Sequence, residues 1–417
     1  MKKFLMMLFL LSLFWGASTQ DLTYVRKVLD TLTSPGMAGR GYVDNGEKIA
    51  AEFIRNEYER FGLKKLDNYF QNFKMPINIF PDTLKVVLDG KVLIPGEDYV
   101  VLSSSPSVNG KFDIVWLERD STGKFTDVPR VDLTGKVLVT AKNQRQFSKE
   151  LDTTYLDYGF AGIVYLQEDK PWWHVSDGYR VKDYFAIQIE KDKIAEDSKT
   201  ISIVVENQFY PEYPTQNVIG FVEGKLHPDS FFVFTAHYDH LGKMGSQTYF
   251  PGANDNGSGT AALLDLAKYY SQPEYQPDIS IAFLAFSAEE AGLIGSSYYA
   301  SHPLFPLENI VFLINLDMVG SGSQGIKVVN GTVFRNEFET LQKINTENDL
   351  LNGISERGEA ANSDHYPFYA RGIPCFFIYT LGDECKEYHN IYDTSENVPF
   401  TDYYDLFRLL VRFEKTF

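Results

Sequence analysis

Cysteine is scarce in this chain of 417 residues, which contains only Cys375 and Cys385. A framework of several disulfides is therefore excluded as the source of its stability. The two thiols are close in sequence, so in an oxidising compartment we expect them to pair and close a short loop. Two buried free thiols are the alternative.

Basic residues are also few. The chain has 39 Lys and Arg residues and 56 Asp and Glu residues, which give a net charge of −17 at pH 7. An acidic surface argues against nucleic acids and anionic membranes as partners. The length allows two or more domains with a sizeable core.

Long apolar runs are absent beyond the N-terminus. There, Lys2 and Lys3 precede an apolar run from Phe4 to Trp15, and small residues follow. The run is too short to span a bilayer as a helix, and the pattern predicts a secretory signal peptide over residues 1–19. We therefore expect a secreted or periplasmic protein without a membrane anchor after cleavage, and a retained N-terminal anchor is the alternative.

Three regions follow the N-terminal run. Residues 20–73 read as helical, with a helix over Asn45–Phe61 that Gly62 ends. Residues 74–213 contain short strand-like runs separated by turns, and one helix over Phe147–Tyr158.

In residues 214–417, strands alternate with helices. The strands are expected at Asn217–Val222, Phe231–Thr235, Ser280–Phe286, Val311–Leu316 and Cys375–Tyr379, and the helices at Gly259–Tyr270 and Asp402–Phe413. Such alternation predicts an α/β fold with a mixed, mostly parallel sheet sandwiched by helices. Active sites of such sheets lie at the carboxyl ends of the strands.

Chemically active side chains occur in the loops beyond these strands. They are His237, Asp255, the pair Glu289-Glu290, Asp317 and His389. Singly, each has an ordinary explanation as a cap, a turn residue or a solvated acidic helix start. Together they supply the imidazole and carboxylate ligands that zinc prefers, one set of five for two metals sharing a carboxylate. The extra carboxylate of the Glu pair would take a proton from water.

These motifs resemble the two-zinc aminopeptidase family that includes aminopeptidase Y, with its relatives glutamate carboxypeptidase and glutaminyl cyclase. The resemblance covers residues 216–417, with a weaker match near residues 39–61. It implies two zinc ions per chain, one bound by His237 and Asp317, the other by Glu290 and His389, with Asp255 bridging. It also implies Glu289 as general base, Asp239 as the residue that orients His237, and a cis peptide bond after Asp255.

Two further segments match motifs of these enzymes. The segment Asn362–Phe368 resembles a motif near the substrate site. This implies a position for Asp364 beside the metal ligands or the substrate, and substrate contact or oxyanion support by His365, with packing as the alternative for His365. Tyr379 is a second candidate for oxyanion support. The runs Leu133–Val139 and Gly159–Tyr165 resemble an inserted, β-rich protease-associated domain, here 74–213, in which Trp172, Trp173 and His174 either pack or form a binding platform.

The resemblance therefore predicts a metallo-aminopeptidase acting on peptides, with the zinc exopeptidase fold. Three alternatives stay open: a one-zinc glutaminyl cyclase, a carboxypeptidase on the same fold, and a non-enzymatic binding protein. Side-chain specificity and oligomeric state do not follow from the sequence.

Overall fold

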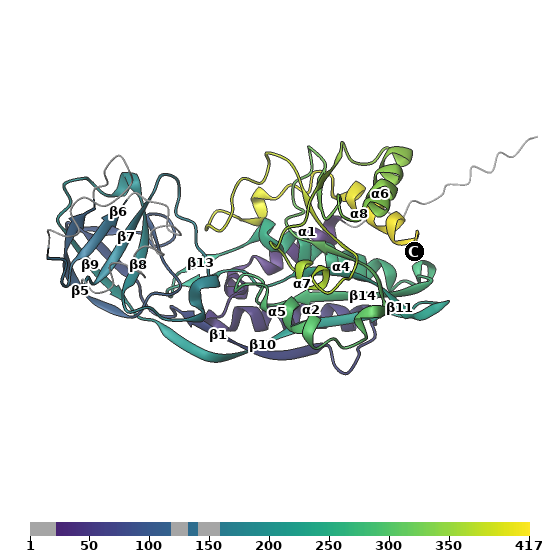
Figure 1. Cartoon of the computed structure of the whole chain (residues 1–417), viewed down its shortest axis with the longest axis horizontal. Coiled ribbons are helices and arrows are strands. Elements are labelled where there is room, and N and C mark those ends of the chain that lie inside the picture. Colours follow the sequence, from purple (N-terminus) through teal and green to yellow (C-terminus); the bar gives the residue numbers. More distant parts are fainter. Residues whose placement is uncertain (1–21, 118–131, 141–158) are drawn as a thin grey trace, which may run out of the picture.

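Two lobes make up the chain in the computed structural model, which describes residues 22–117, 132–140 and 159–417. One lobe consists mainly of strands, and the other is a sheet covered by helices (Figure 1). The signal peptide expected over residues 1–19 and the helix expected over Phe147–Tyr158 lie outside the described residues. No helix of the described residues has the length and apolar character needed to cross a membrane.

The helix-covered lobe is built on an eight-stranded sheet with the order β1-β10-β14-β11-β15-β18-β16-β17. The strands are β1 (Phe70–Ile79), β10 (Gln208–Val222), β11 (His227–His237), β14 (Ile279–Phe286), β15 (Ile310–Leu316), β16 (Ile326–Val329), β17 (Ile354–Arg357) and β18 (Cys375–Thr380). Neighbours are parallel for β14/β11, β11/β15, β15/β18 and β16/β17, and antiparallel elsewhere. The predicted mixed, mostly parallel sheet is therefore confirmed.

The register of the central strands brings their carboxyl ends to one edge. His237 at the end of β11 is paired with Phe286 at the end of β14, and Leu316 of β15 with Ile378 of β18. Residues that directly follow these strands therefore start from neighbouring positions.

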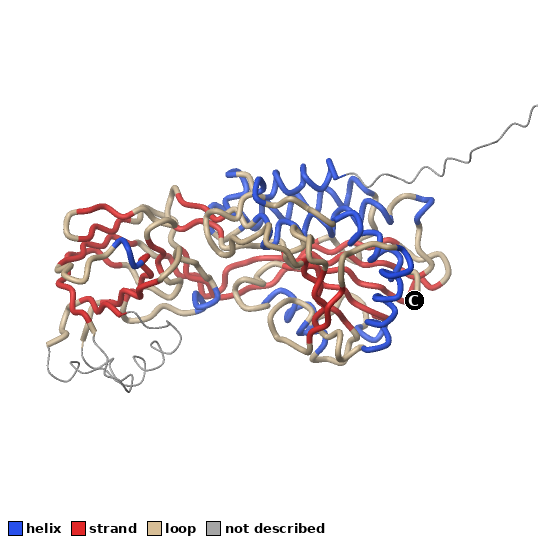
Figure 2. Tube along the Cα trace, turned by 90° about the horizontal axis from the view of Figure 1, so that it is seen from above, coloured by secondary structure: helices blue, strands red, loops and turns tan. Residues whose placement is uncertain are grey.

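Helices cover both faces of this sheet (Figure 2). One face packs against α1 (Leu22–Leu32), α2 (Gly46–Phe61), α4 (Gly259–Tyr270), α6 (Arg335–Asn348) and α8 (Tyr403–Glu414), which share one hydrophobic core. The other packs against α5 (Ile294–Ser301) and α7 (Tyr366–Tyr369). The α4 helix is buried on nearly every side, as its almost continuous apolar sequence requires. Gly62 ends α2 in the left-handed conformation, φ +76°, that glycine adopts readily.

The strand-rich lobe contains a second sheet, whose described strands have the order β3-β2-β9-β5-β6-β7-β8-β4. They are β2 (Lys85–Leu88), β3 (Lys91–Leu93), β4 (Tyr99–Val101), β5 (Val108–Trp116), β6 (Val137–Thr140), β7 (Gly162–Gln167), β8 (Phe185–Glu190) and β9 (Thr200–Val205). The antiparallel pair β1 and β10 runs between the two lobes (Figure 1). The identification of this lobe as a protease-associated domain stays a prediction.

The N-terminal helical region ends earlier than expected. Its predicted end was Phe73, but β1 begins at Phe70. In β1, buried residues such as Phe73 and Met75 alternate with exposed ones, which is the period of a half-buried strand rather than of a helix.

The expected pairing of the two cysteines is wrong, because both thiols are free. Cys375 is the first residue of β18, and its Sγ lies 3.6 Å from the carbonyl oxygen of His365. Cys385 follows that strand, and its Sγ lies 3.7 Å from the carbonyl oxygen of Asn397. An extended strand advances about 3.3 Å per residue and so carries the second thiol away from the first.

Candidate metal centre

The residues singled out at the strand ends lie together at one edge of the large sheet. His237 is the last residue of β11, and Asp317 directly follows β15. The Glu289-Glu290 pair lies in the loop after β14, Asp255 in the turn before α4, and His389 in the loop after β18. The fold therefore gathers side chains that are up to 152 residues apart in sequence (389 − 237).

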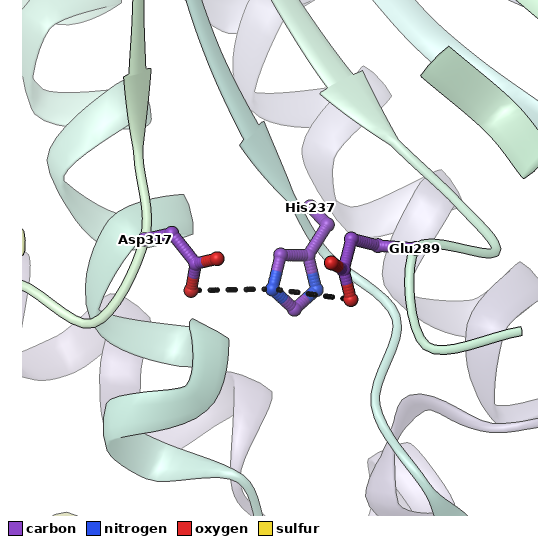
Figure 3. Close-up of side chains that lie close together, drawn as sticks. All are labelled: His237, Glu289 and Asp317. Carbon is purple, nitrogen blue, oxygen red and sulfur yellow. Dashed lines mark hydrogen bonds and ion pairs between the residues drawn. The ribbon is translucent and has the colours of Figure 1, made fainter. Parts of the chain in front are cut away.

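One group forms around His237 (Figure 3). Its Nε2 atom lies 3.4 Å from Oδ1 of Asp317 and 4.0 Å from Oε2 of Glu289. All three side chains offer an atom within 4.8 Å of one another.

A second group forms around His389. Its Nε2 atom lies 3.0 Å from Oδ2 of Asp255 and 3.3 Å from Oε2 of Glu290. The other oxygen of Glu290, Oε1, lies 2.8 Å from Nδ1 of the buried His240. The sequence analysis did not single out His240, although it stands in the same Ala236–His240 run as His237.

Asp255 lies between the two groups. Its Oδ1 is 3.4 Å from Nε2 of His237, while its Oδ2 faces His389. The peptide bond between Asp255 and Asn256 is cis, as the family resemblance implies. The Asp393 carboxylate accepts hydrogen bonds from the backbone N–H groups of Asn254 and Asp255, at 2.8 and 3.1 Å. This contact fixes the turn that presents Asp255.

A chain of hydrogen bonds holds Asp317. Ser363 donates from Oγ to Oδ2 of Asp317 at 2.7 Å, and Asn315 donates to Ser363 at 2.8 Å. Thr235 of β11 in turn donates to Asn315 of β15 at 2.6 Å. All four residues are buried, so the chain sets the direction of the Asp317 carboxylate from within the sheet.

Asp239 acts on the Glu289 loop as well as on His237. Its carboxylate accepts a hydrogen bond from the backbone N–H of Glu289 at 3.1 Å and one from the Tyr42 hydroxyl at 3.4 Å. Nδ1 of His237 is 3.2 Å from the backbone oxygen of Asp239 and 3.8 Å from its carboxylate. The imidazole is therefore closer to the main chain of Asp239 than to its side chain.

The other predicted substrate-site residues differ in burial and in their contacts. Asp364 and His365 are fully buried, and the His365 ring packs 5.3 Å from that of Phe377. Tyr379 also packs against Phe377, with ring centroids 5.3 Å apart. Sequence reasoning missed Tyr388, which stacks on His389 with centroids 3.9 Å apart and an interplanar angle of 16°. Its place directly before His389 was the only signal.

The part of the chain that contains both groups is similar to a known protein family. Residues 217–413, which contain both groups, match the model of Peptidase family M28. The resemblance seen in the sequence is thereby confirmed.

Similar proteins agree with this family. Aminopeptidase YwaD of Bacillus subtilis is 34% identical over 194 residues, which are 44% of this chain and 39% of that protein. The match to leupeptin-inactivating enzyme 1 of Streptomyces exfoliatus, 34% identical over 168 residues, covers 38% of this chain and 34% of that enzyme. The matched part is thus less than half the length of these curated relatives.

A solved zinc aminopeptidase from Bacillus subtilis has the same fold over almost the whole chain. Its TM-score is 0.71 at 21% identity, with 94% of each chain covered. The aminopeptidase from Aneurinibacillus sp. strain AM-1 gives a TM-score of 0.68 at 21% identity, covering 95% of this chain and 93% of that one.

Negative charge dominates the protein interior around the two groups. Asp239, Asp255, Glu290, Asp317, Asp364 and Asp393 are all buried there. Among the described residues, Arg40 is the only Arg or Lys whose side chain is buried. Its guanidinium donates to the carbonyl oxygens of Tyr238, Leu32, Pro251 and Gly252, at 2.6 to 3.1 Å. It therefore ties the loops of the site to the N-terminal helices through backbone carbonyl groups rather than by pairing with the carboxylates.

Burial and these neighbouring carboxylates alter the pKa values of ionisable groups in the site. Burial disfavours a charged His389, but Glu290 and Asp255 outweigh it and raise its pKa to about 9. Burial raises the pKa of Glu289 well above its usual range; His237 opposes this, while Glu290 and Asp364 add to it. Burial also raises the pKa of Asp393 to about 7. The site attracts positive charge, which is the property a cation site requires.

Proposed function

We propose that the chain is a secreted, zinc-dependent exopeptidase that hydrolyses N-terminal peptide bonds. The observation that carries the proposal is the position of Asp255. One of its carboxylate oxygens faces His237 and the other faces His389, at 3.4 and 3.0 Å. A carboxylate shared between two histidine-carboxylate groups is the arrangement that a two-metal hydrolase needs.

The spacing of the donor atoms supports zinc. Ligand atoms about 2.0–2.1 Å from a tetrahedral zinc ion lie roughly 3.3 Å from one another. His237 Nε2 is 3.4 Å from oxygens of both Asp255 and Asp317. His389 Nε2 is 3.0 and 3.3 Å from oxygens of Asp255 and Glu290. We therefore assign His237, Asp317 and Asp255 to one zinc ion, and His389, Glu290 and Asp255 to the other.

Glu289 and His240 have different places in this assignment. Glu289 Oε2 is 4.0 Å from His237 Nε2, outside the spacing expected between ligands of one zinc ion, and its side chain is 14% exposed. We infer that Glu289 faces the substrate as general base. His240 contacts the Glu290 oxygen that points away from His389, so we assign it to holding that ligand.

The chemistry follows from these positions. Zinc, when bound, supplies Lewis acidity that activates a water molecule and polarises a carbonyl group. Glu289 takes the proton that the attacking water loses and delivers it to the leaving amine. Asp239 keeps Glu289 in place by accepting its backbone N–H.

Recognition of an amino end is favoured over recognition of a carboxyl end. The buried carboxylates of the site attract the positive α-amino group of a peptide. Arg40, the only buried Arg or Lys among the described residues, donates to backbone carbonyl groups and is therefore not available to bind a terminal carboxylate.

The domain organisation belongs to the same proposal. Residues 1–19 are a signal peptide, residues 20–73 and 214–417 form the zinc peptidase domain, and residues 74–213 form an inserted protease-associated domain. The mature protein is released outside the cytoplasm or into the periplasm and acts on peptides there.

A panel of aminoacyl anilides tests this function, with each substrate also supplied in N-acetylated form. We expect hydrolysis of the free-amine substrates only, its loss on chelation and its recovery with added zinc. Equal cleavage of blocked and free substrates would contradict an aminopeptidase. Cyclisation of an N-terminal glutaminyl substrate without anilide hydrolysis would instead identify a glutaminyl cyclase.

A further inference from the structure

The segment Trp172-Trp173-His174 of the strand-rich lobe reaches the candidate metal centre. It follows β7 and precedes β8, and so belongs to the lobe that contributes none of the candidate ligands. Its contact is with His389, 215 residues away from His174.

Trp173 and His389 exchange two hydrogen bonds. The backbone N–H of Trp173 donates to the carbonyl oxygen of His389 at 2.9 Å, and Nδ1 of His389 lies 2.9 Å from the carbonyl oxygen of Trp173. The backbone of His389 has φ +53°. Residues other than glycine adopt this left-handed conformation only at a cost in free energy. The backbone bond from Trp173 holds His389 in this conformation.

The pairing also determines which nitrogen of His389 is free. A carbonyl oxygen only accepts, so Nδ1 of His389 carries the proton and donates to Trp173. Nε2, which faces Asp255 and Glu290, is therefore the nitrogen left to bind a metal ion. The ring of His174 lies beside it, with Nδ1 atoms 3.1 Å apart and centroids 4.7 Å apart at an angle of 73°.

Contacts with Val101 and Phe250 hold the Trp173 side chain in place. Its side chain is 4% exposed, its Nε1 donates to the carbonyl oxygen of Val101 at 2.6 Å, and its ring packs 5.0 Å from that of Phe250. Next to it, Lys170 forms an ion pair with Glu387 at 3.1 Å. The segment is therefore a rigid support rather than a loose loop.

We propose that Trp172–His174 is a positioning element that orients His389 for metal binding, so that the strand-rich lobe is part of the metal centre. This inference rests on the proposed function in one respect, that His389 is a zinc ligand. Groups that hold a ligating histidine by its second nitrogen typically contribute about 10–100-fold to metal affinity. The lobe thereby acts on the affinity of one zinc ion.

Zinc affinity of the full-length protein tests this directly. The two dissociation constants would be measured by competition with a chromogenic chelator in wild type, Trp173→Ala, Trp173→Phe, His174→Ala and His174→Asn. His389→Ala identifies which binding step belongs to that ligand. His227→Ala is the matched control, because it removes an exposed histidine at the other end of β11. Circular dichroism confirms that each variant is folded.

The two alanine variants in the Trp172–His174 segment should weaken the His389 step by about 10–100-fold and leave the other step within about threefold. Trp173→Phe keeps the packing against Phe250, and His174→Asn keeps a polar atom near Nδ1, so both should recover most of the affinity. Folded alanine variants with both constants at wild-type values would overturn the inference, as would equal weakening of both steps. A wild-type protein that binds no zinc would overturn the proposed function itself.

Discussion

Four of the five candidate ligands of the metal centre have a second residue that holds them in place. Ser363 holds Asp317, His240 holds Glu290, Trp173 holds His389, and Asp393 holds the backbone of Asp255. Such contacts order a site before a metal or substrate enters it, and ordering in advance is what makes binding and catalysis efficient.

Replacement of Glu289 separates metal binding from catalysis. Glu289→Gln removes the proton acceptor but keeps the size of the side chain, so kcat on an aminoacyl anilide should fall by about 10²–10⁴-fold. Zinc content should not change, because Glu289 is not among the assigned ligands. Glu308→Gln, which alters an exposed Glu near β15, is the control. Near-normal turnover by Glu289→Gln would rule out its role as base.

The sequence allowed the grouped residues to be predicted, but not the residues that hold them. His237, Asp255, Glu289, Glu290, Asp317 and His389 stand out because their chemical types recur beyond apolar strands. The segments of Ser363 and Trp173 stand out in the sequence, but the contacts of Ser363, Asp393 and Trp173 with the ligands do not, since these contacts depend on how loops pack in space. His240 carries no separate signal either, because it stands in the same loop as His237.

At the scale of the element, α8 contains a buried charge that makes stability depend on pH. Burial raises the pKa of Glu414 from 4.5 to about 7, and Tyr270 donates to its Oε2 at 3.1 Å. The folded protein therefore binds a proton here more tightly than the unfolded chain. The contribution to stability is fully present below about pH 4.5 and is lost as the pH rises to about 7.

Glu414→Gln should remove the loss of folding stability that occurs between about pH 4.5 and pH 7. The variant should match wild type in thermal stability at pH 4.5 and exceed it at pH 8, by up to about 3 kcal/mol. Thermal unfolding at both pH values, with the exposed Glu396→Gln as control, measures the difference. A stabilisation that is equal at the two pH values would contradict the buried ionisation.

Secondary structure was predictable where one pattern dominates. The helices over Gly46–Phe61 and Gly259–Tyr270 and the buried strands of the large sheet agree with the sequence to within a few residues. The first half of β10 and all of β1 were not predicted as strands. Both extend beyond the helix-covered lobe as an antiparallel pair, so their pairing reflects the connection of the lobes rather than a local apolar run.

At the scale of the whole molecule, the contact between the two lobes could not be predicted from the sequence. Trp173 is buried and packs against Phe250, as one of the two expectations for this segment stated. Neither expectation included the contact with His389. A hydrogen bond between residues 216 positions apart leaves no periodicity in one sequence. The sheet edge of the candidate centre was predictable because strand order in α/β folds obeys general rules, whereas no such rule places an inserted lobe.

Zinc stoichiometry is the most direct test of the two-metal site. Purified protein, dialysed against trace zinc and then against metal-free buffer, would be analysed for zinc per chain together with Asp255→Ala. We expect two zinc ions in wild type and the loss of tight binding at both positions in Asp255→Ala, since one carboxylate serves both groups. One zinc ion or none in wild type, or two retained without Asp255, would contradict a shared two-zinc centre.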